Sequence, residues 1–227
     1  MRVLHLVDRV SRKGGADVHL RDLVAEQRRR HRVSLAYGRQ QSSLPSGVTG
    51  TQIRGLASPV ASSSGLSGLV DLLQQAEIVH LHNVMNPTVL KLASATGRAV
   101  VTVQDHRMFC PGPGRSLPDG AACARRMGDT ACSICLPEPA YRQRLLALTE
   151  ARLGALEGAR TLVLSHYMAR ELEAAGCPGA EVVPPWIEAG PPRTEAGEGF
   201  VLGGRLVRHK APWLAWQAWR SSGSSQA

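Results

Sequence analysis

Long apolar runs are missing from this sequence of 227 residues. No stretch approaches the roughly 20 consecutive apolar residues that a membrane-spanning helix needs. The first residues, MRVLHLVD, carry charge too early to form the apolar core of a secretory leader. Hydrophobic residues make up 43% of the chain and charged residues 20%, which favours a folded globular protein over disorder. We therefore expect a cytoplasmic protein with one full domain and a remainder.

Aromatic residues and lysine are also scarce. Aromatics make up 4% of the chain, and only three of its 27 basic residues are lysine. The formal net charge of +9 would suit nucleic acid, an anionic membrane surface or an anionic substrate. Single-stranded nucleic acid is usually bound by stacking its bases on aromatic side chains, so we expect no nucleic-acid partner. The densest basic cluster, residues 28–32, is more simply a solvated helix end whose arginines complement the helix dipole.

Short apolar runs alternate with amphipathic stretches over most of the chain. Strands are predicted over residues 3–7, 33–37, 51–53, 77–82, 99–103, 161–164 and 181–183. Helices are predicted over residues 17–29, 69–75, 87–95, 141–156 and from Ser165 to Gly176. The helix over 141–156 is expected to bury one stripe of side chains, made of Tyr141, Leu145, Leu148, Leu153 and Leu156.

This order of elements predicts an α/β fold, a Rossmann-like parallel sheet with helices on both faces. Ligands of such sheets bind beyond the carboxyl ends of the strands. Four segments directly follow strands and should gather at that edge: residues 8–15, 82–86, 104–109 and 165–167.

Residues 184–199 have the proline-rich and glycine-rich composition of a linker. Beyond them, residues 200–207 are predicted to form a strand and a turn, and residues 211–219 a helix. One strand and one helix cannot bury a core. We therefore expect a Rossmann-like domain over 1–188, with a cysteine-rich insertion at about 110–139, a linker over 189–199 and the truncated start of a second domain over 200–227.

Three segments at the predicted edge carry candidate chemistry. Gly14 and Gly15 precede a helix and would let backbone N–H groups approach a phosphate, although a tight turn is the simpler explanation for the pair alone. Asp105, His106 and Arg107 follow a strand, where they could bind sugar hydroxyls or handle a proton; a turn capped by Asp105 is the alternative. In the run EIVHLH, His82 with Asn83 is expected at the edge, and His80 in the core.

Four cysteines share the insertion: Cys110, Cys123, Cys132 and Cys135. The Cys-x-x-Cys pair and two more distant cysteines suit a tetrahedral structural zinc ion, which would stabilise a loop with little core of its own. Free thiols and disulfides are the alternatives. We expect no catalytic metal.

Arg205 and Lys210 lie five residues apart at a predicted strand-to-helix turn. A guanidinium and an ammonium so placed suit a diphosphate, although an ordinary basic turn has the same composition.

Taken in order, these motifs resemble those of glycosyltransferase family 4. The resemblance rests on Gly14-Gly15, residues 77–82, the Asp105 loop running into Phe109-Cys110-Pro111, residues 164–166 with 183–188, and Gly204-Arg205 with Lys210, and it covers residues 1–220. It implies the GT-B architecture, two Rossmann-like domains facing each other across a cleft, of which this chain has the amino-terminal half.

The resemblance also implies a retaining transfer from a nucleotide-diphosphate-sugar donor without a catalytic metal. By resemblance, the donor is bound by Gly14, Gly15, Arg205 and Lys210, the catalytic residues are Asp105 and His106, and the acceptor is bound by His82, Asn83 and Arg107. The sequence departs from the family pattern in having Gln104 before Asp105, with the histidine one residue beyond, and in lacking a counterpart of the family's two glutamates.

Two functions therefore stay open. The first is a glycosyltransferase of glycan, polysaccharide or glycolipid biosynthesis, or an inactive fragment of one whose second domain is supplied in trans. Its acceptor would be a glycan or a lipid-linked glycan, and its location the cytoplasm, with peripheral contact at the cytoplasmic face of an anionic membrane. The alternative is a non-catalytic, zinc-bearing module whose basic surface binds polyanions.

Overall fold

The computed structural model describes residues 1–185, 201–204, 206 and 211–222. The chain divides into two compact units, Met1–Ile187 and Glu188–Ala227, which are described separately. Within the described residues, no helix combines the length and apolarity required to cross a membrane.

The first unit is built on a seven-stranded sheet in the order β3-β2-β1-β4-β5-β6-β7. Every pairing in it is parallel. The strands are β1 (Arg2–Val10), β2 (Arg32–Gln40), β3 (Thr49–Gln52), β4 (Ile78–His82), β5 (Ala99–Val103), β6 (Arg160–Val163) and β7 (Glu181–Val182). The predicted parallel sheet is confirmed, and each predicted strand of this unit is present with shifted ends or, for residues 99–103, with the same ends.

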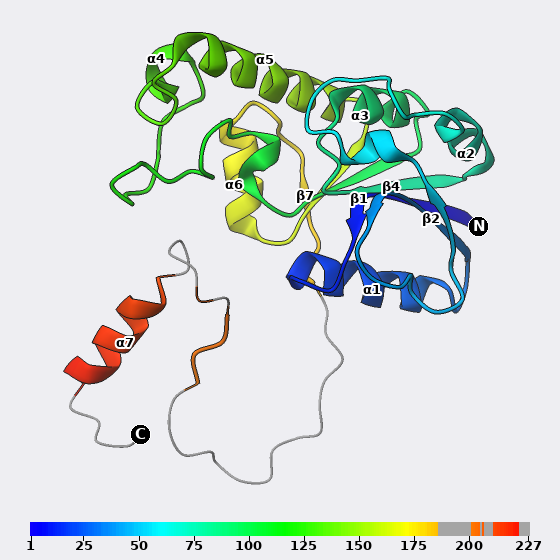
Figure 1. Cartoon of the computed structure of the whole chain (residues 1–227), viewed down its shortest axis with the longest axis horizontal. Coiled ribbons are helices and arrows are strands. Elements are labelled where there is room, and N and C mark those ends of the chain that lie inside the picture. Colours follow the sequence, from blue (N-terminus) through cyan, green and yellow to red (C-terminus); the bar gives the residue numbers. More distant parts are fainter. Residues whose placement is uncertain (186–200, 205, 207–210, 223–227) are drawn as a thin grey trace, which may run out of the picture. The chain divides into compact units, whose positions relative to one another are not determined.

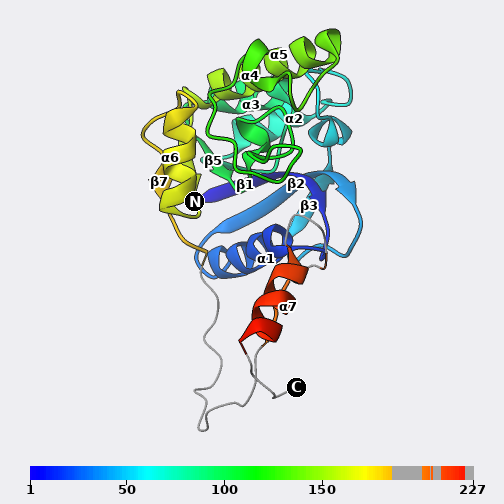
Figure 2. The ribbon, with the colours of Figure 1, turned by 90° about the vertical axis from the view of Figure 1, so that its left-hand side faces the viewer.

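Helices cover both faces of the sheet, as predicted (Figures 1 and 2). Alternate residues of β1 point to opposite faces, so Val3 and Val7 pack in one core with α1 (Gly15–Gln27). Leu4 and Leu6 belong to the larger core on the other face. The helices on that side are α2 (Leu69–Gln75), α3 (Pro87–Ser94), α5 (Pro139–Leu156) and α6 (His166–Ala174).

Local sequence signals explain where these helices begin and end. The Asn86 side chain accepts a hydrogen bond from Thr88 N, and Pro87 occupies the first turn of α3. Ser165 accepts from Met168 N and caps α6, as predicted. Gly176 has a φ of +92°, a left-handed conformation that glycine adopts without strain at a helix end.

The predicted buried stripe of α5 is wrong except at Leu156. Tyr141 is 48% exposed, whereas Arg142, Thr149 and Arg152 are buried with Leu146, Ala155 and Leu156. The helix turns this face inward because both arginines bond groups of neighbouring loops. Arg142 donates to Asp129 and to Leu136 O, and Arg152 donates to three backbone carbonyls.

Three shorter elements complete the first unit: η1 (Arg54–Ala57), η2 (His106–Met108) and α4 (Asp129–Cys132). In the second unit, α7 (Pro212–Ser221) corresponds to the predicted terminal helix and buries none of its residues. Residues 201–204 and 206 are not in a strand, so the predicted strand is absent from the described part of 200–207. Most of the predicted linker lies outside the described residues.

Candidate functional site

The sheet has a topological switch point between β1 and β4. The chain continues from β1 outward to β2 and β3, and from β4 outward to β5, β6 and β7. At such a point, the connections that follow two neighbouring strands run to opposite faces of the sheet and leave a crevice between them. Ligands of open parallel sheets bind in this crevice. The four segments predicted to share this edge do so, because they follow the parallel strands β1, β4, β5 and β6. We call this edge the rim, made of residues 8–15, 82–86, 104–109 and 165–167.

The glycine pair leaves open space at the start of α1. Gly14 has extended backbone and precedes the helix, and Gly15 is its first residue. A methyl group added at Gly15 would meet no atom within 4 Å, and one at Gly14 would meet only Asp17 Oδ2, at 3.9 Å. Asp17 N and Val18 N donate to Gly14 O, which leaves the N–H groups of Gly15 and Ala16 for a ligand. Asp17, itself 8% exposed and bonded to Ser11 Oγ at 2.6 Å, adds a negative charge to the same turn.

Asp105 and Arg107 form a bidentate ion pair at the rim. Arg107 Nε lies 3.0 and 2.9 Å from the two carboxylate oxygens, and its Nη2 lies 2.8 Å from Oδ2. Asp105 also accepts from Arg107 N at 2.9 Å, so it caps η2 as the turn alternative predicted. The hydrogen bonds that Arg107 donates to the Asp105 carboxylate raise the pKa of Arg107. In this arrangement the carboxylate orients a guanidinium and is not a free base.

Asn83 connects this pair to the strand end of β5. Its φ of +55° is a left-handed conformation, which asparagine tolerates better than most residues. Its side chain donates to Gln104 Oε1 at 2.9 Å and accepts from Arg107 Nη2 at 3.4 Å. Gln104 Nε2 is buried and has no hydrogen-bond partner among the described residues. Such an orphaned donor is costly and marks Gln104 as part of the candidate site.

Asp8 is a rim residue that the sequence motifs did not single out. It lies near the carboxyl end of β1, and Arg9 Nη1 is 3.3 Å from its Oδ2. Burial raises the pKa of the Asp8 carboxyl, while the charges of Arg9 and Arg107 oppose that shift. A shifted carboxyl in a crevice is typical of functional sites. The only sequence signal was an acidic residue interrupting an apolar strand.

His106 faces away from the Asp105 carboxylate, toward α6. Its Nε2 lies 3.2 Å from the Tyr167 hydroxyl, and its ring meets Phe109 edge-on at 5.5 Å between centroids. Burial lowers the pKa of His106, opposed by the charges of Glu171 and Asp105. The two residues predicted to be catalytic are therefore adjacent in sequence but turned toward different partners.

His82 is the buried first residue of its rim segment, which differs from the expectation that it contacts an acceptor. It is 2% exposed and its Nε2 is 3.0 Å from His5 Nδ1, so a bound acceptor would not touch it. The residue of this pair at the rim is Asn83. His80 is in the core, as expected, with Nε2 2.7 Å from Thr102 Oγ1.

All five cysteines are free thiols, and the four in the insertion are half-buried. Burial raises the pKa of Cys135, and the charges of the other three cysteines of the insertion raise it further. Their sulfurs do not converge to ligand distances: among the described residues, the only metal-type group within 4.8 Å is His5, His80 and His82. Arg205 and Lys210 lie outside the described residues.

Comparison with known proteins gives a family. The model of Glycosyltransferase Family 4 matches residues 13–190. A similar solved structure is that of Phytolacca americana UGT2 complexed with UDP-2fluoro-glucose and pterostilbene, at 14% identity and a TM-score of 0.46. The similarity covers 85% of this chain and 55% of that one, so the chain spans about half the length of this neighbour. No curated protein matches the chain.

Proposed function

Because the chain belongs to glycosyltransferase family 4, we propose that it acts in the transfer of a sugar from a nucleotide-diphosphate-sugar donor to a hydroxyl group of a glycan or a lipid-linked glycan. The observation that carries this proposal is the rim. There, the open space over Gly15 and the Asn83–Arg107–Asp105 network belong to the segments that gather at one edge of the sheet.

The donor side of the reaction is assigned to the glycine pair. A leaving nucleotide diphosphate gains negative charge, which fixed N–H dipoles and cations stabilise. The open first turn of α1 supports this role because a phosphate oxygen can approach its N–H groups closely. We assign Arg205 and Lys210 to the same diphosphate, on the resemblance alone. A retaining reaction without a catalytic metal is part of the proposal.

The acceptor side is assigned to Asn83, Asp105 and Arg107. The guanidinium is held by both carboxylate oxygens and by the Asn83 amide oxygen, so its direction is fixed before a ligand arrives. A fixed donor of this kind orients a sugar hydroxyl at low entropic cost. Asp105 then acts by positioning Arg107, and His106, in contact with the Tyr167 hydroxyl, is the proposed proton acceptor.

Donor binding tests the proposal directly. We would titrate UDP-glucose and GDP-mannose into the full chain by calorimetry, alone and with a family 4 second domain added in trans, and then assay release of the nucleotide. Gly15→Leu should abolish donor binding without changing the fold, because the added side chain fills the open space. Gly154→Leu is the matched control, since Gly154 is also a helical glycine with no atom within 4 Å of an added methyl.

Two outcomes would contradict the assignment. One is that no nucleotide sugar binds even when the second domain is present. The other is that Gly15→Leu binds the donor as tightly as the unmodified chain. Asp105→Asn and Arg107→Met should lower transfer without lowering donor binding, because they act on the acceptor side.

A basic hollow at the opposite edge of the sheet supports peripheral membrane contact. It has a volume of about 680 Å³ and is lined by Met1, Arg2, Arg28, Arg30, His31, Arg32 and Glu77. Such a hollow suits the phosphates of anionic lipids or of another polyanion, and it would hold the protein at the cytoplasmic face of a membrane. Flotation with anionic and neutral vesicles tests it. Arg30→Glu/Arg32→Glu should lose binding to anionic vesicles, and Arg144→Glu, on exposed α5 surface, should keep it.

The cysteine insertion is proposed to bind a structural zinc ion through Cys110, Cys123, Cys132 and Cys135. The electrostatic effect of Cys110, Cys123 and Cys132 on Cys135 supports this role, and the ion would draw the sulfurs to tetrahedral distances. Elemental analysis should find zinc that Cys132→Ser/Cys135→Ser removes. Four freely titrating thiols in a folded, zinc-free protein would reject this site. If the rim fails its test while zinc and polyanions bind, the chain is a zinc-bearing binding module.

A further inference from the structure

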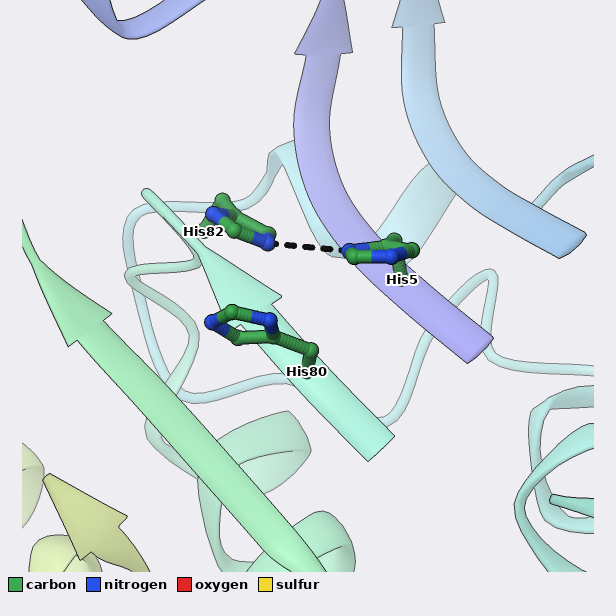
Figure 3. Close-up of side chains that lie close together, drawn as sticks. All are labelled: His5, His80 and His82. Carbon is green, nitrogen blue, oxygen red and sulfur yellow. Dashed lines mark hydrogen bonds between the residues drawn. The ribbon is translucent and has the colours of Figure 1, made fainter. Parts of the chain in front are cut away.

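Three histidines from two neighbouring strands meet on the face of the sheet that α1 covers (Figure 3). His5 of β1 pairs directly with His80 of β4, and His82 follows two residues later on the same face. The ring centroids are 5.3 Å apart for His5 and His80, 5.2 Å for His5 and His82, and 4.0 Å for His80 and His82. One ring nitrogen from each residue lies within 4.8 Å of the other two.

These imidazoles are dry and neutral. Their exposures are 0% for His5, 6% for His80 and 2% for His82. Burial lowers the pKa of His5 to about 4 and that of His80 to about 3, and it holds the pKa of His82 well below its usual value. A neutral imidazole keeps a lone pair, which is the form that binds a metal ion.

Two of the rings are already oriented by oxygen atoms. His5 Nε2 lies 2.8 Å from Gln27 Oε1, which can only accept, so the hydrogen of His5 is on Nε2 and its Nδ1 carries the lone pair. His80 Nε2 contacts the Thr102 hydroxyl at 2.7 Å, which leaves its Nδ1 for another partner. Metal-binding histidines usually have an oxygen partner of this kind on the nitrogen that does not bind the metal.

His82 has an orphaned nitrogen. Since His5 Nδ1 accepts, His82 Nε2 donates across the 3.0 Å contact and His82 Nδ1 bears no hydrogen. This Nδ1 is buried without a partner among the described residues. This Nδ1 can take up the ring hydrogen, so His82 Nε2 can become a lone-pair donor like His5 Nδ1 without losing a hydrogen bond at Nδ1.

We propose that His5, His80 and His82 bind one divalent transition-metal ion of the zinc class. In tetrahedral coordination with Zn–N distances of about 2.0–2.1 Å, ligand nitrogens lie about 3.3 Å apart. The His5–His82 contact, at 3.0 Å between Nδ1 and Nε2, is slightly shorter than this, so the two rings would move apart a little and the His80 ring would rotate toward them. The hydrogen of His82 moves from Nε2 to the unpartnered Nδ1, so no proton is released. A water or small anion takes the fourth position.

The ion would join the two strands that flank the switch point. β1 leads into the glycine pair, and His82 directly precedes Asn83 at the rim. A metal bond between β1 and β4 would therefore hold the donor and acceptor sides in register. This inference does not depend on the proposed sugar transfer, because ion binding is measured without a donor or an acceptor.

Cobalt(II) is the probe, because its spectrum distinguishes ligand types. We would titrate Co²⁺ into the metal-free full chain with the four insertion cysteines replaced by serine, and then displace it with Zn²⁺. One Co²⁺ per chain should bind, with visible ligand-field bands and no thiolate charge-transfer band. If the serine variant does not fold, the same titration is done on the unmodified chain. Binding at the histidines is then recognised by ligand-field bands that grow without a thiolate charge-transfer band.

Matched variants separate ligation from packing. His82→Gln should lower Co²⁺ affinity more than tenfold, whereas His166→Ala, which removes an exposed histidine outside the cluster, should leave it unchanged. Gln27→Leu should weaken binding by about 10–100-fold, because it removes the oxygen partner of His5. Absence of the ligand-field bands overturns the proposal, as does unchanged affinity in both His82→Gln and Gln27→Leu. If His82→Gln does not fold, Gln27→Leu decides.

Discussion

Replacing Arg152 by methionine should loosen the rim. Arg152 is buried in α5 at 8% exposure, and it donates Nε to Met85 O at 2.9 Å, Nη1 to Arg107 O at 3.2 Å and Nη2 to Pro59 O at 2.6 Å. These carbonyls belong to the loop after β4, to η2 and to the loop after η1. One side chain therefore ties together three segments that are far apart in the sequence.

The expected loss of unfolding free energy in Arg152→Met is the difference between two large, opposing effects. A hydrogen bond to a charged group is worth roughly 1.5–3 kcal/mol, whereas burying a guanidinium among neutral carbonyls costs several kcal/mol. Burial, and then the charge of Arg107, lowers the pKa of Arg152, so desolvation cancels part of what the hydrogen bonds contribute. Methionine fills much of the volume and leaves three carbonyls without a donor. We expect Arg152→Met to lose about 2–4 kcal/mol of unfolding free energy.

Urea unfolding followed by circular dichroism measures this loss. Arg144→Met is the matched control on the exposed side of the same helix and should change stability by less than about 0.5 kcal/mol. Arg152→Lys replaces the planar guanidinium by one ammonium, and its stability should lie between those of Arg152→Met and Arg144→Met. Hydrogen exchange should accelerate near Met85 in the methionine variant. If Arg152→Met is as stable as the unmodified chain, desolvation outweighs the hydrogen bonds and the reasoning is wrong.

Three further substitutions test other parts of the first unit. Gly38→Ala should cost at least about 2 kcal/mol, because its methyl would lie 2.4 Å from Ala57 N and 2.6 Å from Asp8 O, backbone atoms that cannot rotate away; an unchanged melting temperature would contradict this. Asp8→Asn should stabilise the fold at neutral pH and have no such effect below about pH 4. The reason is that burial raises the folded-state pKa of Asp8, so the unmodified chain loses stability as the pH rises through that pKa. Urea unfolding of both proteins at pH 7 and below pH 4 tests the sign of the change in unfolding free energy. Asn86→Asp should cost about 2 kcal/mol, since a carboxylate cannot donate to the two buried carbonyls that the Asn86 amide reaches; greater stability in thermal melts would show that the charge at the helix cap wins.

The sheet could be predicted because its signals are local. The run over residues 99–103 is apolar and β-branched, and β5 has those ends. α2 likewise begins and ends where its sequence pattern does. Ser165 supplies the cap of α6 from within the first turn. Each of these features depends on residues no more than a few positions apart.

The inward face of α5 and the histidine cluster depend on distant partners. The carbonyl groups that Arg152 reaches lie 45 to 93 residues away in the sequence, so a hydrophobic stripe could not reveal that an arginine is buried. Because side chains alternate along a strand, the run EIVHLH indicates that His80 and His82 share one face of the strand. Their third member, His5, lies 77 residues from His82, and only the register between β1 and β4 brings it there.

The charges of the rim determine which ligand it can hold by itself. Asp8, Asp17 and Asp105 are carboxylates of the rim or of the first turn of α1, and Arg107 is already shared with Asp105. Arg12 bonds Ser43, and Arg21 bonds Ser42. Arg9 is likewise paired with Asp8, so the exposed Lys13 is the cation beside the glycine pair that a diphosphate at Gly15 would meet, together with the helix N–H groups. Donor affinity should therefore rise with cations from outside the first unit, which is the role proposed for Arg205 and Lys210.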